Sequence, residues 1–91
     1  MQLIVKSEAR STLVELAEGE QAVIEHLDLP EDFARRLMEL GFLPGHVVTA
    51  ARSAPGGDPR VFRVDGSEIA LRRATAARLH VRPTASPASV V

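Results

Sequence analysis

Histidine is the residue type in this sequence with the widest choice of chemistry, and it occurs three times. His26, His46 and His80 fall on three different predicted strands or strand starts, and none stands two or four residues from another histidine. Cysteine is absent, so thiolate metal sites and disulfides are excluded. Three histidines would form a site only if the fold brought them together, and we favour surface or strand-edge positions for them. We therefore expect no metal site and no cofactor.

Hydroxyl and carboxylate groups give no catalytic arrangement either. Ser53, Ser67 and Thr75 have no neighbouring histidine to act as a general base. We identify no pair of carboxylates placed on one face for acid–base work. The sequence therefore predicts no catalytic residue and no enzymatic activity.

Two segments resemble anion-binding sequences only in part. Gly56-Gly57-Asp58 lacks the lysine and Ser/Thr that open a helix in a phosphate-binding loop, so a structural turn is favoured. Arg72 and Arg73, with Arg78 and Arg82, have the charge to contact phosphates. However, tryptophan and tyrosine are absent and phenylalanine occurs three times, which leaves few rings for stacking on bases. We expect no nucleic-acid binding from this composition.

The bulk composition is that of one small soluble domain. The chain has 91 residues, of which 45% are hydrophobic and 25% charged. No apolar run approaches the roughly 18 residues of a membrane span, and the N-terminal MQLIVKSEARS has no signal-peptide pattern. A cytoplasmic location is therefore expected. Residues 1–45 carry nine acids and four bases, whereas residues 46–91 carry seven bases and three acids, so the charge is divided between the two halves.

One helix is predicted over residues 30–40, with Pro30 as its first residue because proline there sacrifices no hydrogen bond. Phe33, Leu37 and Leu40 recur at i, i+4 and i+7 and are expected to form the stripe that faces the core, widened by Ala34 and Met38.

The helix is predicted to stop within the segment RLMELGFLPG. Gly41 supplies the positive φ that ends such a helix, and Phe42 is placed to close back on Leu37. Pro44-Gly45 then predicts a tight turn into the next strand.

The rest of the chain predicts short strands and turns. Asp65-Gly66 is a strong hairpin signal that places Val64 opposite Ser67 and Arg63 opposite Glu68, with Phe62 opposite Ile69. The other predictions are strands at 2–6, 21–27, 46–54 and 79–81, a turn closing on Gly19, a stiff loop at Pro55–Pro59 and a helical turn at 72–78. About five short strands need their edges covered, so we predict a mainly β, partly open small barrel with one helix inserted between the first and second strands.

Several segments together resemble the FeoA (ferrous iron transport protein A) family. They are Leu13-x-x-Leu16-x-x-Gly19-x-x-Ala22-x-Ile24, Arg36-Leu37-x-x-Leu40-Gly41-Phe42-x-Pro44-Gly45-x-x-Val48, Pro55-x-Gly57-Asp58-Pro59 and Ile69-Ala70-Leu71-Arg72. The resemblance covers residues 13–82, which leaves 1–12 as an N-terminal extension and 83–91 as a flexible tail. It implies an SH3-like barrel and a cytoplasmic, non-enzymatic accessory role with the membrane GTP-binding transporter FeoB. Membrane association would then run through that partner only.

The resemblance leads to a hypothesis about the partner surface. Arg35, Arg36, Met38 and Leu43 are expected to form it, as a small apolar patch beside two arginines. The alternative that Leu43 only closes the barrel end stays open. Two other functions also stay open: a free-standing metal-sensing domain of the iron-dependent-repressor type, disfavoured because no helix-turn-helix precedes the domain, and a nucleic-acid-binding small barrel.

Overall fold

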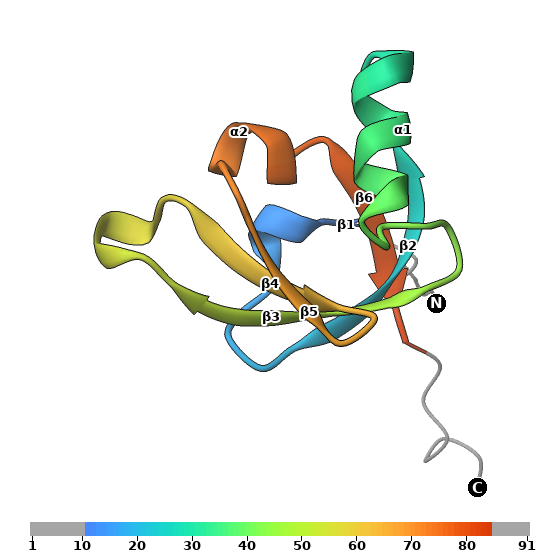
Figure 1. The fold of residues 1–91 in the computed structure, drawn as a ribbon. Coiled ribbons are helices and arrows are strands. Elements are labelled where there is room, and N and C mark those ends of the chain that lie inside the picture. The colour runs from blue at the N-terminus through green and yellow to red at the C-terminus, as the bar shows by residue number, and fades with distance from the viewer. Residues whose placement is uncertain (1–10, 85–91) are drawn as a thin grey trace, which may run out of the picture.

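An antiparallel sheet that curves around its own core forms most of the molecule (Figure 1). The computed structural model describes residues 11–84. Its strands are β1 (Ser11–Thr12), β2 (Gln21–Leu27), β3 (Val47–Ser53), β4 (Arg60–Val64), β5 (Ser67–Leu71) and β6 (Leu79–Pro83), in the order β1-β6-β2-β3-β4-β5. The helices are α1 (Glu31–Glu39) and α2 (Arg73–Ala76), and two 3₁₀ turns are η1 (Leu13–Glu15) and η2 (Pro55–Gly57). The predicted mainly β barrel is confirmed, with α1 inserted between β2 and β3, the first two long strands.

The interior of the barrel is apolar. Phe42 and Phe62 are its largest fully buried side chains. Around them lie Leu13, Ala22, Ile24, Leu37, Val48, Ala50, Val64, Leu71, Ala76, Leu79 and Val81. Buried and exposed residues alternate along most strands, because successive side chains of a strand point to opposite faces. Every long strand therefore contributes to one shared core.

The hairpin of β4 and β5 has the predicted register. Val64 pairs with Ser67, Arg63 with Glu68, and Phe62 lies opposite Ile69. Arg63 Nη2 donates to Glu68 Oε2 at 2.8 Å on the outer face. The Asp-Gly turn adopts positive φ at both residues, as this type of hairpin requires.

Helix α1 begins one residue later than predicted. Pro30 has φ −54° and ψ 148°. Because this ψ is extended, Pro30 is the N-cap of the helix and not a residue of its first turn. The Pro30 carbonyl accepts a hydrogen bond from the Ala34 N–H at 2.8 Å, which is the first bond of the helix. The prediction that Pro30 is the first helical residue is therefore wrong.

The core-facing stripe of α1 is narrower than predicted. Ala34 and Leu37 are buried, but Phe33 keeps 40% and Leu40 keeps 47% of its surface exposed. In Figure 1 α1 rises beyond the barrel, and within the helix itself only Ala34 and Leu37 are buried. The expectation that Phe33 and Leu40 face the core is therefore wrong, because the apolar arc of the helix is wider than its contact with the barrel.

The end of α1 follows the prediction. Gly41 has φ +117°, and the N–H of Phe42 donates to the Leu37 carbonyl at 3.1 Å. Phe42 is completely buried. The turn at Pro44-Gly45 is also present, with positive φ at Gly45. The apolar residue after the helix thus holds the helix end to the core.

Arg60 is the only charged residue buried among those that the structure describes. It is 6% exposed, and its guanidinium donates to the carbonyl oxygens of Val14 at 3.0 Å and Leu16 at 2.7 Å. The guanidinium carbon also lies 5.5 Å from the ring centre of Phe62. One strand residue thereby ties the segment around η1 to the barrel.

Some predictions fall at or beyond the limits of the described residues. The strand expected at 2–6 and residues 85–91 of the expected tail lie outside them, while Pro83 is the last residue of β6. Of the helices in residues 11–84, none has the length and apolar character needed to cross a membrane.

Candidate functional site

One flank of α1 presents apolar side chains around a cation. Phe33 and Leu40 are among the most exposed large hydrophobic residues described, and Arg36 stands three residues after the first and four before the second. Residues with this spacing lie in one row along a helix. Asp32, Phe33 and Arg36 also line a shallow surface depression. We call Phe33, Arg36 and Leu40 the α1 stripe.

The predicted partner residues are divided between two sides of this helix. Arg35 and Arg36 are both exposed, and Met38 and Leu43 are half-buried. By helical geometry Arg35 and Met38 share the flank opposite the α1 stripe, because they are three residues apart and about 100° of rotation separates successive residues. Leu43 lies in the loop that follows the helix. The structure therefore brings Arg36, but not Arg35, into the α1 stripe.

The end of α1 meets the β4–β5 turn. His46 Nδ1, just before β3, lies 3.4 Å from Asp65 Oδ1. Both side chains are about half exposed, so solvent weakens the contact. The loop 41–46 is thereby held against the turn at the side of the molecule where Leu43 lies.

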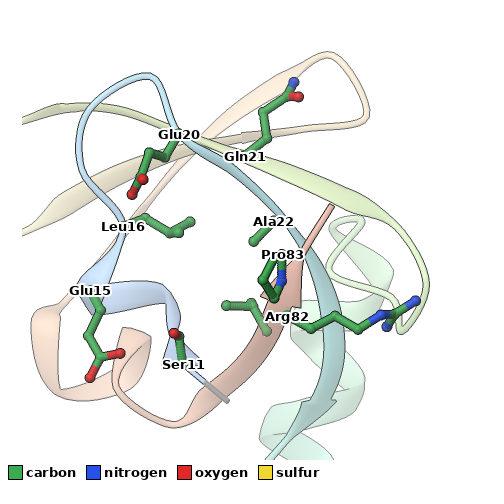
Figure 2. Close-up of a pocket in the computed structure, with 9 residues that line it drawn as sticks. Ser11, Glu15, Leu16, Glu20, Gln21, Ala22, Arg82 and Pro83 are labelled. Carbon is green, nitrogen blue, oxygen red and sulfur yellow. The ribbon is translucent and has the colours of Figure 1, made fainter. Parts of the chain in front are cut away.

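A second concave region lies between the η1 segment and strands β2 and β6. Its volume is about 180 Å³. Figure 2 shows Leu16 pointing toward Ala22 and Pro83, while Arg82 extends away from them. The carboxylates on its rim already accept hydrogen bonds from main-chain N–H groups. Glu20 Oε1, for example, accepts from the N–H of Ala17 at 2.7 Å. This pocket has a small apolar floor, and its polar groups do not converge on a common point.

The loop at Pro55–Pro59 has a structural task that its sequence did not reveal. Oδ1 of Asp58 accepts a hydrogen bond from the N–H of Arg73, the first residue of α2, at 3.0 Å. Asp58 is thus a helix cap supplied from 15 residues away, and no local sequence signal predicts such a contact. The loop also contains the η2 turn and a cis peptide bond between Asp58 and Pro59.

The histidines do not form one cluster. His26 and His80 are stacked, with ring centres 4.6 Å apart and planes inclined by 7°, while His46 contacts Asp65. Nowhere in residues 11–84 do three or more His, Asp or Glu residues stand as a metal-binding group.

Comparison with protein-family models identifies a family. A model described as the FeoA domain matches residues 11–83. A curated relative is the "Fe(2+) transport protein A/Fe(2+) transporter FeoB fusion protein" of Porphyromonas gingivalis, 38% identical over 82 residues. The alignment covers 85% of this chain and 10% of the fusion protein, so the chain spans about a tenth of that relative.

Solved structures of similar sequence share the fold. The FeoA protein of Chlorobium tepidum is 32% identical, with a TM-score of 0.77, over 81% of this chain and 70% of that one. FeoA of Stenotrophomonas maltophilia, solved as a zinc complex and described as an SH3 domain protein, is 40% identical with a TM-score of 0.67. The match covers 77% of this chain and 87% of that one. The expected SH3-like architecture is therefore confirmed.

Proposed function

From the premise that this chain belongs to the FeoA family of ferrous iron transport, we propose that it is a non-enzymatic accessory protein that binds a FeoB-type transporter at the cytoplasmic side of the membrane. The observation that carries this proposal is the relative from Porphyromonas gingivalis, in which the two proteins form one polypeptide. Fusion holds two domains at a high effective concentration and in a fixed ratio. Such linkage is useful when the two parts act on each other.

The α1 stripe is the surface that we assign to this contact. Phe33 and Leu40 supply apolar area that the barrel does not use, and Arg36 supplies a cation between them. Helices recognised by a groove commonly present side chains at i, i+3 and i+7 in this way. Aromatic, leucine and arginine side chains that become buried on binding contribute apolar area and charge-assisted hydrogen bonds.

Leu43 extends the same proposal beyond the helix. It follows the buried Phe42, is half-buried itself, and belongs to the loop held near Asp65. Leu43→Asp distinguishes its two roles: loss of the folded circular dichroism spectrum would assign Leu43 to packing. A folded variant with weakened transporter binding would assign it to the partner surface.

The proposal is tested by immobilising the FeoB-type transporter of the same organism in lipid nanodiscs and adding the purified chain. We expect saturable binding that salt weakens, because one element of the surface is a cation. Empty nanodiscs are the control for membrane adsorption. Absence of saturable binding to the transporter, or equal binding to empty nanodiscs, would overturn the proposed function.

A further inference from the structure

The stacked pair His26 and His80 has no role in the proposed contact with the transporter. The two residues face each other across neighbouring strands, as direct register partners of β2 and β6. His26 is exposed and His80 is half-buried, so solvent reaches the pair. Thr12 is the register partner of His80 on its other side, in β1. The two rings therefore stand side by side on the outer surface of the barrel.

An irregularity in the sheet creates this arrangement. In the first part of β2, Ile24 lies opposite Val81. Continued without change, that register would place Glu25 opposite His80. The register shifts between Ile24 and His26, however, and the extra residue brings His26 opposite His80. A bulge of this kind turns a side chain toward the other face of a sheet, and bulges are frequent next to functional sites.

We propose that His26 and His80 together bind one divalent late transition-metal ion, such as Zn²⁺ or Ni²⁺. Neutral imidazole is a preferred ligand for these ions, and each ring has one nitrogen with a free lone pair. The chain has no cysteine and only one other histidine, so this pair holds two of its three imidazoles. The remaining coordination positions of the ion face solvent and are filled by water or by a donor from another molecule.

The stacked arrangement of the rings must open before they can bind one ion. Metal–nitrogen bonds of 2.0–2.1 Å place two nitrogen ligands of a tetrahedral ion about 3.4 Å apart. The ring centres are 4.6 Å apart, and their planes are nearly parallel. Each lone pair lies in the plane of its ring, so nearly parallel rings do not aim at a common point. To share one tetrahedral ion, each ring must tilt by roughly 50–60° out of the stacked arrangement. Exposed side chains reorient in this way within picoseconds to nanoseconds, without movement of the strands.

Charges beside the pair do not prevent cation binding. Arg82 is two residues from His80 along β6, which places it on the same face of the strand. Its Nη1 lies 3.9 Å from Oε2 of Glu25, so a carboxylate offsets that positive charge. Thr12, on the other side of His80, is neutral. The immediate surroundings therefore add little net positive charge.

Metal titration of the tag-free protein tests the site, because a polyhistidine tag would compete for the ion. Isothermal titration calorimetry with zinc chloride and nickel chloride near pH 7.5 is applied to the wild type, His26→Asn, His80→Asn and His46→Asn. The last is the matched control, since it removes the histidine that contacts Asp65 and lies outside the pair. We expect one ion per wild-type chain and a loss of affinity of at least about tenfold in His26→Asn and in His80→Asn. His46→Asn should bind as the wild type does.

Two further measurements keep the test decisive. Circular dichroism shows whether each variant is folded. If His80→Asn is not folded, His26→Gln, which changes the exposed member of the pair, is measured in its place. Nitrogen NMR of the imidazole rings should show both His26 and His80 shifting at one equivalent of Zn²⁺. Binding that is unchanged in every pair variant, or no binding by the wild type at millimolar metal, would overturn the proposal. The result is independent of transporter binding, so the two proposals can fail separately.

Discussion

Gly41 and Asp65 are packed so closely that a Cβ atom on the glycine would press against the aspartate carboxylate. A Cβ atom built on Gly41 would lie 3.0 Å from Oδ2 of Asp65 and 3.3 Å from Cγ1 of Val64. The end of α1 therefore rests directly on the β4–β5 turn. This contact links the helix that carries the proposed partner surface to the most regular hairpin of the barrel.

Gly41→Ala should lower the free energy of unfolding by about 2–4 kcal/mol, because it adds a steric conflict to a φ of +117° that alanine rarely adopts. Gly45→Ala is the matched control. Gly45 has φ +92° but nothing within 4 Å of a built Cβ, so only the backbone strain of about 1 kcal/mol is expected. Urea unfolding of both variants measures the difference. Equal losses would contradict close packing at Gly41.

Arg60→Met should destabilise the fold by about 2–3 kcal/mol, since the carbonyls of Val14 and Leu16 lose their donor. Arg63→Met, which breaks an exposed ion pair with Glu68, should cost less than about 1 kcal/mol. Thermal unfolding of the two variants compares them. A neutral Arg60→Met would mean that the cost of burying the guanidinium cancels its hydrogen bonds.

Asp58→Ala should destabilise α2 and the protein by about 0.5–1.5 kcal/mol, because the Arg73 N–H loses its acceptor. Asp58→Asn keeps a carbonyl oxygen at the same place and should retain most of the stability. Hydrogen exchange of the Arg73 amide reports on this bond directly. If the Arg73 amide exchanged faster in Asp58→Asn than in Asp58→Ala, the assigned role of Asp58 as a helix cap would be contradicted.

Leu40→Ser should weaken transporter binding by about tenfold or more while leaving the fold intact, because Leu40 is 47% exposed in the free protein. Surface substitutions of this kind usually change stability by less than about 0.5 kcal/mol. Paired measurements of melting temperature and transporter affinity separate the two effects. Unchanged affinity would remove Leu40 from the partner surface.

Local signals explain the features that could be predicted from the sequence. Asp65-Gly66 sets the register of the hairpin by turn geometry alone, and the pairs on both faces then follow from alternation. Gly41 and Phe42 likewise mark a helix end through contacts only a few residues apart. The need to cover the edges of short strands predicted the partly open barrel, and the family motifs added that it is SH3-like.

Features that depend on distant contacts could not be predicted. The spacing of Phe33 and Leu40 identifies the apolar side of α1, but not how much of that side the barrel covers. The shift that brings His26 opposite His80 leaves no local pattern, because strand alternation alone places Glu25 there. Asp58 caps a helix that begins 15 residues later, so its role also appears only in the folded chain.

The central claim is that one flank of α1 recognises a FeoB-type transporter, and a pair of charge reversals tests it most directly. Arg36→Glu and Arg35→Glu change the net charge equally and lie on the same helix, and both side chains are exposed. Titrating the transporter in nanodiscs with each variant should show an affinity at least about tenfold weaker for Arg36→Glu, and within about twofold of the wild type for Arg35→Glu. Equal losses for both variants, or no binding by the wild type, would contradict the account.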